Sequence, residues 1–331
     1  MDTIQSTMSE SKAPTTSPKS EKSAAQKVSK AGSFIAGGLA ACIAVTVTNP
    51  IELVKTRMQL QGELSATNQK IYKNPFQALS VIYKNEGIRG LQKGLSCAYI
   101  YQIGLNGCRL GFYEPVRSTL NGVFFAGQDV HKVQSVPVNV VSGALSGIIG
   151  AIIGSPLYLV KTRMQSFSTS IKIGEQTHYN SFIDGLTSIY KKEGGFLGLF
   201  RGVDAAILRT GAGSSVQLPI YNAAKNFLLE NNIMKEGTSL HLVSSTMSGI
   251  GVGVVMNPWD VILTRVYNQK GDLYKGPIDC FVKTVRIEGI GALYKGFGAQ
   301  LFRIAPHTIL CLTFMEQTMK LVYGVEKRLF A

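Results

Sequence analysis

Histidine and cysteine are scarce in this sequence, and neither forms a pattern with catalytic or metal-binding spacing. The four histidines are scattered along the chain, which argues against a catalytic site built on histidine. The five cysteines include no CxxC pair and no Cys/His set with zinc spacing, so we expect reduced, buried thiols. A nucleophile–base constellation and a phosphate-binding loop are missing as well. The sequence therefore predicts no enzyme, no metal and no cofactor.

Charge is also scarce, although one sign dominates. Charged residues make up 16% of the chain, against roughly 25% in soluble domains, and the mean hydropathy is +0.14. The net charge of +14 fits either a nucleic-acid-binding protein or a membrane protein with basic loops. The segment from Lys55 to Lys93 holds seven basic residues against two acids, whereas the loops at 122–132 and 230–237 are nearly neutral. This one-sided distribution predicts a membrane protein that does not bind nucleic acid.

Residues 1–28 contain almost no large apolar side chain and are rich in Ser, Thr, Lys and Pro. This composition predicts a disordered tail. It has neither the apolar core of a secretory signal nor the arginine-rich pattern of a transit peptide. We therefore expect any organelle address to lie in the segments that follow.

Two motifs recur three times in the same order. "NPIELVKTRMQ" from Asn49 returns as "SPLYLVKTRMQ" from Ser155 and "NPWDVILTRVY" from Asn257. "EGIRGLQKG" from Glu86 returns as "EGGFLGLFRG" and "EGIGALYKG". Recurrence about every 100 residues indicates tandem repeats, which we place at 29–128, 129–235 and 236–331.

Each repeat holds two apolar segments. The first precedes the proline and carries no charged residue in the ranges Ala31–Ile51, Val133–Val160 and Gly237–Trp259. A helix needs about 20 apolar residues to cross the hydrocarbon core. The second segment follows Gly94, Gly202 or Gly296 and carries an arginine, which is costly in a membrane unless it faces a wet cavity or a partner. The sequence thus predicts six transmembrane helices.

The motif pair, repeated three times over roughly residues 30–325, resembles the mitochondrial carrier family. The resemblance implies an all-α membrane protein with six transmembrane helices in a pseudo-threefold bundle and short helices on the matrix side. It also implies the mitochondrial inner membrane, an internal targeting signal and both termini toward the intermembrane space. A threefold bundle within one chain needs no partner, so we expect a monomer in the bilayer, in contact with cardiolipin.

The first motif is expected to close the matrix end. Proline kinks a helix, so helices bent at Pro50, Pro156 and Pro258 can converge. In the family, the acid of one odd helix pairs with the base of the next. The pairs expected in this sequence are Glu52–Lys161, Asp260–Lys55 and the non-ionic Tyr158–Leu263. Both losses of charge fall in one pair, so no buried charge is left alone. Gln59 and Gln165 occupy the positions that brace this gate in the family.

A second ring is expected at the cytoplasmic end. The family's aromatic–acid–x–x–base pattern matches Tyr113, Glu114 and Arg117 in repeat one. Repeat two offers Tyr221, Asn222 and Lys225, whereas repeat three has Glu316 followed by Met319 and Lys320. Cyclic pairing gives Glu114–Lys225, Glu316–Arg117 and the non-ionic Asn222–Met319. Two gates that are not both closed at once give alternating access.

The cargo is expected between the gates. Arg209 and Arg303 occupy the same repeat position, where repeat one has Tyr101. Two arginines facing one cavity, apart from the gate charges, favour a compact dianion. Arg209 followed by Thr210 resembles the keto-acid and dicarboxylate carriers of the family, so the expected cargo is oxaloacetate or a small dianion such as sulfate. Further candidate ligands on the first even helix are Gln102, Asn106 and Arg109.

Several alternatives stay open at this stage. The transport can be proton symport or anion exchange, and a dicarboxylate–phosphate exchanger is the nearest rival cargo class. A carrier-like receptor or channel without turnover is the alternative outside transport. Asp204, two residues after Gly202, is expected as an intramembrane acid that either pairs with a base near the matrix gate or takes part in proton coupling.

Overall fold

The computed structural model describes residues 29–64, 71–125 and 135–329, so the tail expected at residues 1–28 lies outside the described part. The described residues form helices, and six of these helices are long. They are α1 (Lys30–Leu60), α3 (Leu95–Phe124), α4 (Val136–Ser166), α7 (Val203–Glu230), α8 (Thr238–Asn268) and α10 (Phe297–Leu329). Shorter elements connect the two long helices of each repeat: α2 (Pro75–Leu91), α5 (Phe182–Lys192), α6 (Phe196–Leu199), α9 (Pro277–Glu288) and η1 (Ile290–Tyr294).

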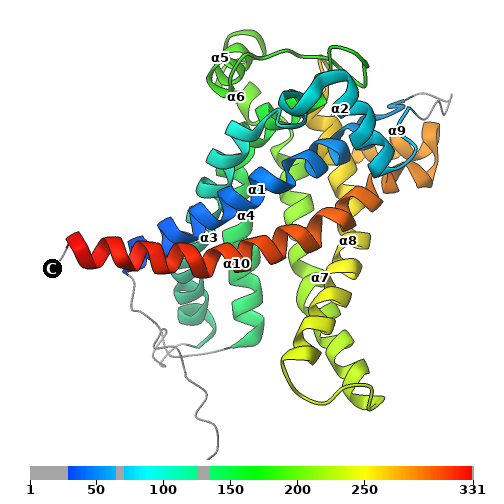
Figure 1. Cartoon of the computed structure of the whole chain (residues 1–331). Helices are drawn as coiled ribbons and strands as arrows, with labels where there is room; N and C mark the ends of the chain where they lie inside the picture. The colour runs from blue at the N-terminus through cyan, green and yellow to red at the C-terminus, as the bar shows by residue number, and fades with distance from the viewer. Residues whose placement is uncertain (1–28, 65–70, 126–134, 330–331) are drawn as a thin grey trace, which may run out of the picture.

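The long helices pack as three neighbouring pairs, α1 with α10, α3 with α4 and α7 with α8. The pairs meet at the end that carries the short helices and diverge toward the other end (Figure 1). Every long helix contains one proline in its interior, which removes a backbone hydrogen bond and favours a kink. These prolines are Pro50, Pro115, Pro156, Pro219, Pro258 and Pro306. The architecture is the predicted six-helix, three-repeat membrane fold.

The glycine that ends each second motif sets the start of an even helix. Gly94, Gly202 and Gly296 have φ values of 76°, 78° and 77°, a region that other residues rarely adopt. A Cβ on Gly202 would lie 2.8 Å from Val266 Cγ1, and one on Gly296 would lie 3.0 Å from Gln59 Cγ. Glycine is therefore required at these positions both for the turn and for close packing of each even helix on a neighbouring odd helix.

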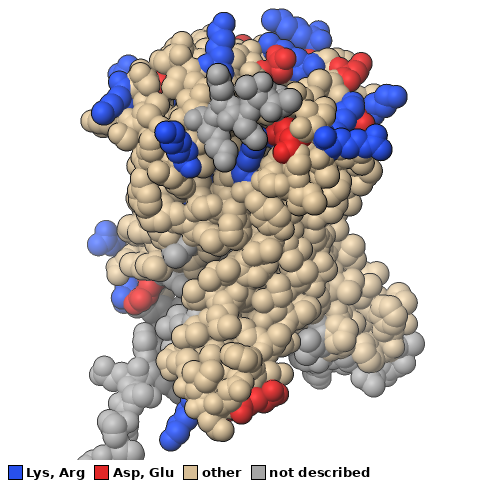
Figure 2. Space-filling model, turned by 90° about the vertical axis from the view of Figure 1, so that its right-hand side faces the viewer, with Lys and Arg blue, Asp and Glu red and all other residues tan. Residues whose placement is uncertain are grey.

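The distribution of charge over the surface fits a membrane protein. Helices α1, α4 and α8 are long and apolar enough to cross a membrane. Charged side chains gather at the end that carries the short helices, and below it most of the face shown in Figure 2 carries none, apart from a few at its left edge and lower end. Such a sparsely charged surface suits the hydrocarbon core of a bilayer.

Candidate functional site

Two ion pairs join the odd helices just past their prolines. Lys161 Nζ of α4 lies 2.7 Å from Glu52 Oε1 of α1. Lys55 Nζ of α1 lies 2.7 Å from Asp260 Oδ2 of α8. The structure thus brings together both of the ionic pairs expected at the matrix end. Lys55, Lys161 and Asp260 are buried, so water weakens these pairs little.

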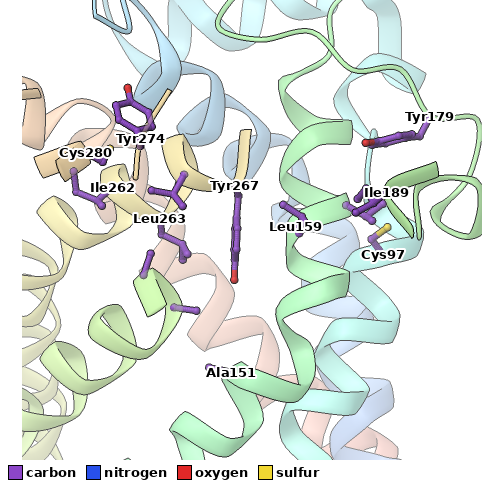
Figure 3. Packing of buried hydrophobic residues seen from close by; sticks show 14 of the residues in the cluster. Cys97, Ala151, Leu159, Tyr179, Ile189, Ile262, Leu263, Tyr267, Tyr274 and Cys280 are labelled. Atoms are coloured by element: carbon purple, nitrogen blue, oxygen red, sulfur yellow. The ribbon is translucent and has the colours of Figure 1, made fainter. Parts of the chain in front are cut away.

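The third position of this ring is filled by aromatic and aliphatic packing. The ring of Tyr158 lies 5.2 Å from that of Tyr101 and 5.6 Å from that of Tyr267, measured between centroids. Lys161 Nζ also lies 5.4 Å from the centroid of Tyr158, a favourable cation–π distance. Figure 3 shows the ring of Tyr267 between Leu263 of its own helix and Leu159 of α4. Apolar contact between α4 and α8 therefore takes the place of the third ion pair.

The glutamines expected to brace the ion pairs bind neighbouring hydroxyl groups instead. Three hydrogen bonds link the odd helices in a cycle: Thr264 to Gln59 at 2.8 Å, Thr56 to Gln165 at 3.2 Å, and Ser155 with Tyr267 at 2.8 Å. Each bond joins a different pair of odd helices. Tyr267, which stands where the other repeats have glutamine, keeps the cycle closed through its hydroxyl group.

A further ring of arginines, which the sequence reasoning missed, lies beyond the ion pairs. The last base of each first motif binds the acid that opens the second motif of the same repeat: Arg57–Glu86, Arg163–Glu193 and Arg265–Glu288. Arg57 also donates to the carbonyl oxygens of Gln165 at 3.0 Å and Phe167 at 2.9 Å. Cations at a helix C-terminus satisfy free carbonyl groups and the helix dipole. The sequence did contain a signal for these pairs, because the arginine of the first motif and the glutamate of the second motif recur in all three repeats.

The same ring fixes the charge of its carboxylates. Burial alone raises the pKa of Glu86, but hydrogen bonds from Arg57, Lys93 and Ser168 outweigh burial and hold that pKa at about 2. In the third repeat, Arg265 and Lys295 lower the pKa of Glu288 against the same opposing effect of burial. These carboxylates stay ionised at neutral pH.

A cavity of about 190 Å³ lies between the two ends of the bundle. Tyr101 and Gln102 of α3 line it, together with Arg209 of α7 and Arg303 of α10. Four cations at this cavity face two carboxylates, because Lys55 and Lys161 border it together with the two arginines, while the acids are Glu52 and Asp260. The cavity therefore carries two uncompensated positive charges.

The two arginines differ in their contacts. Arg209 Nε donates to Asp260 Oδ1, so the expectation that Arg209 stands apart from the gate charges is wrong. Arg303 has a buried Nε without a hydrogen-bond partner among the described residues. Thr210 directs its hydroxyl group to the Ala206 carbonyl at 2.9 Å and lines a smaller space beside Arg209. The side chains of Asn106 and Arg109 lie outside the described part of the chain.

The charges expected at the cytoplasmic gate pair locally. Glu114 binds Arg117 of its own helix at 3.0 Å, and Glu316 binds Lys320 at 2.9 Å. Lys225 lies 3.7 Å from Glu236, which precedes α8.

The aromatic and amide positions of this ring lie at the same end of the bundle. The hydroxyl group of Tyr221 lies 2.6 Å from His241 Nδ1. Tyr113 is half-buried on α3, and Asn222 is exposed on α7. The ion pairs between odd helices are formed at the end that carries the short helices, so the structure represents a state in which that end of the bundle is closed.

The structure places Asp204, which was expected as an intramembrane acid, at the start of α7. It occupies the first turn of α7, is exposed and accepts the Ala205 amide at 2.8 Å. An acid in the first turn of a helix is stabilised by the helix dipole.

Comparisons with known proteins agree with this geometry. The family described as "Mitochondrial carrier protein" matches residues 26–124, 132–232 and 235–326. The "Mitochondrial oxaloacetate transport protein" of Saccharomyces cerevisiae is 76% identical over 308 residues, covering 93% of this chain and 95% of that protein. The protein with the same name in Schizosaccharomyces pombe is 55% identical, covering 91% and 94%. The "Mitochondrial citrate transporter E" of Aspergillus niger is 54% identical, covering 90% and 95%.

Proposed function

The chain belongs to the mitochondrial carrier family and is thus a transporter of the mitochondrial inner membrane, and on this premise we propose that its cargo is oxaloacetate and related small dianions. Sulfate, malonate and other dicarboxylates are the related dianions. Transport proceeds by alternating access, as proton symport or anion exchange. Two relatives covering nearly the whole chain are named for oxaloacetate transport, which supports this choice of cargo.

One observation carries the proposal: Arg303 lines the cavity, and its buried Nε has no hydrogen-bond partner among the described residues. An arginine with an unpaired buried donor in a membrane cavity is costly, and a negative ligand would offset this cost during part of the transport cycle. The guanidinium group offers two parallel donors that suit a carboxylate or a sulfate. The surplus of two positive charges matches a dianion.

The size of the cavity narrows the class of ligand further. Its volume of about 190 Å³ lies below the roughly 300–1,000 Å³ typical of pockets for drug-sized ligands. A four-carbon dicarboxylate or a sulfate fits such a space.

Cargo binding and gate opening are coupled through Arg209. In the structure this side chain binds the gate acid Asp260. A dianion bound between Arg303 and Arg209 competes with Asp260 for the guanidinium group, which weakens the matrix ring. The matrix end then opens, and the cytoplasmic charges exchange their local partners for neighbours across the bundle.

The proposal also covers the side of the membrane on which the two termini lie and the lipids around the protein. The first residue before α1 and the last turns of α10 lie together, since the Ser29 amide donates to Glu326 Oε2 at 3.1 Å. The short helices occupy the opposite, matrix end (Figure 1). Both termini are therefore assigned to the intermembrane space, in a monomer surrounded by a bilayer that contains cardiolipin. Cleavage of an N-terminal tag by protease added to intact mitoplasts tests this orientation.

Uptake into liposomes tests the cargo. The purified protein is reconstituted, and initial rates are measured for labelled oxaloacetate, sulfate, malate, phosphate, citrate and ATP, each with and without internal anion. The proposal expects oxaloacetate and sulfate to be carried fastest and ATP not at all. A preference for phosphate would favour the dicarboxylate–phosphate exchanger, and a preference for citrate would favour the activity named for the Aspergillus relative. No saturable uptake of any anion would indicate a receptor.

A further inference from the structure

His307 of α10 lies one helical turn past Arg303 and lines the same cavity. The other histidines of the described residues lie elsewhere. His241 binds Tyr221 near the open end, and the ring of His178 packs against Phe167 in a matrix segment. Histidine is the side chain whose ordinary pKa, about 6.5, allows proton exchange near neutral pH. His307 is thus the imidazole placed where the cargo binds.

The hydrogen bonds of His307 define its tautomer. Thr48 of α1 donates its hydroxyl proton to the Ala44 carbonyl at 2.9 Å. The lone pairs of that hydroxyl group are left to accept from His307 Nδ1, which lies 3.3 Å away. Nδ1 therefore carries the proton in the neutral ring, and Nε2 holds the lone pair. Nε2 lies 3.7 Å from Cys311 Sγ, a weak contact that leaves it able to take up a second proton.

The charged and titratable groups around His307 are those of the cavity. Glu52 and Lys55 of α1 and Lys161 of α4 line it, with Arg303 from the helix of His307 itself. Tyr101, Tyr158 and Arg209 complete the lining, and Cys311 flanks the ring on α10. Cations outnumber acids in this set, so an imidazolium ion is disfavoured when the cavity is empty. A bound dianion neutralises this surplus of positive charge and so favours protonation of Nε2.

We propose that His307 binds the proton that crosses the membrane together with the dianion, taken up at Nε2 and stabilised at Nδ1 by Thr48. This proposal rests on the proposed function and decides between its two modes of coupling. On the open side, anion and proton bind together because each lowers the free energy of binding of the other. When the matrix end opens and the anion leaves, the surrounding cations expel the proton. Net uptake is then proton symport, while exchange of one anion for another needs no change in protonation.

The test compares gradient-driven uptake with exchange in liposomes. Labelled sulfate is the first probe because sulfate itself does not titrate near neutral pH, and labelled oxaloacetate is the second. Uptake is measured at about pH 6 outside and about pH 8 inside, to either side of the ordinary histidine pKa, and again at equal pH with internal anion. A pH-sensitive dye in the lumen records proton entry. The variants are His307→Gln and, as matched control, His241→Gln.

The proposal expects the gradient to raise uptake several-fold in the wild type and in His241→Gln, with acidification of the lumen. In His307→Gln, exchange persists at a reduced rate, while the gradient effect and the acidification are lost. Gradient-driven uptake that survives in His307→Gln would overturn the proposal. Wild-type exchange without any gradient effect would overturn it too, and leave the proposed function intact. Absence of exchange in the wild type would instead refute the proposed function and this proposal with it.

If His307→Gln does not exchange anions at all, Thr48→Val tests whether His307 binds the transported proton. This nearly isosteric change removes the acceptor of Nδ1 and keeps the imidazole. It disfavours the imidazolium ion, so the pH at which uptake is half-maximal is expected to fall. An unchanged pH profile in Thr48→Val would contradict the proposal.

Discussion

Arg209 of α7 binds Asp260 of α8 within the ring of charges that closes the matrix end. The other oxygen of this carboxylate binds Lys55 at 2.7 Å, so one acid holds two cations from two different helices. A cavity cation thereby becomes part of the gate. This shared acid links the presence of cargo to the strength of the gate.

Replacement of the shared acid is expected to destabilise the closed state strongly. Asp260→Asn leaves Lys55 and Arg209 without a carboxylate, and breaking a buried pair in this way costs ~3–5 kcal/mol. The midpoint of thermal unfolding in detergent should fall, and anion exchange should be lost. The control is Asp272→Asn, which removes an acid whose side chain is fully exposed. Equal midpoints for the two variants would show that Asp260 does not hold the gate.

The cyclic pairing can be tested by introducing an ion pair at Tyr158 and Leu263, the one position of the matrix ring that has none. Leu263→Lys alone buries an unpaired cation, and Tyr158→Asp alone buries an unpaired acid and removes an aromatic contact. Each is expected to destabilise the protein by ~3–5 kcal/mol. The double variant should recover most of this loss, because the two positions form one cyclic pair. It should also exchange anions more slowly than the wild type, since the matrix gate then has three ionic bonds to break. The readouts are the unfolding midpoint and the initial rate of exchange, and a strictly additive loss of stability in the double variant would contradict the pairing.

The repeats explain why so much of the gate could be predicted from the sequence. Each position is seen three times, so Glu52, Tyr158 and Asp260 can be compared as one site. The complementary loss at Leu263 then identifies the partner. The prolines that kink the long helices and the glycines that precede the even helices act through local backbone geometry. Sequence patterns predict such local geometry well.

Other contacts could not be predicted because they join different positions of the repeat. The bond from Arg209 to Asp260 depends on side-chain reach between α7 and α8, which a spacing pattern does not contain. The conformational state could not be predicted either, because Glu114 and Lys225 have the same sequence whether they pair locally or across the bundle.

Reversing the charges of Glu114 and Lys225 tests whether these two residues pair across the bundle. Glu114→Lys places a cation opposite Lys225 when the cytoplasmic end closes, and such like-charge contacts cost several kcal/mol. Exchange of anions should fall at least ~10-fold, which corresponds to about 1.4 kcal/mol. Adding Lys225→Glu should restore it. Adding Arg117→Glu, which rebuilds only the local pair seen in this structure, should not. Rescue by Arg117→Glu in place of Lys225→Glu would refute the cyclic gate.

A carboxyl group beyond the matrix end of α1 makes stability depend on pH. Burial raises the pKa of Glu63 to about 7, although Arg265 and a hydrogen bond from Tyr274 oppose the shift. The folded protein therefore holds this proton more tightly than the unfolded chain, so stability falls as pH rises from about 4.5 through about 7. Glu63→Gln removes this contribution and should flatten the decline of the unfolding midpoint between about pH 5 and pH 8. The control is Glu230→Gln at the exposed end of α7. An unaltered pH dependence in Glu63→Gln would contradict the assignment.

The initial rate of oxaloacetate exchange in Arg303→Ala tests the central claim most directly. The buried Nε of Arg303 has no hydrogen-bond partner among the described residues. Arg303 belongs to neither ion pair of the gate, so its removal breaks neither of them. A charge-assisted hydrogen bond contributes about 1.5–3 kcal/mol, so the rate at limiting substrate should fall roughly 10- to 100-fold. Arg286→Ala, on the exposed face of α9, should exchange at the wild-type rate. Equal rates in Arg303→Ala and Arg286→Ala would show that the two-arginine cavity does not bind the transported dianion.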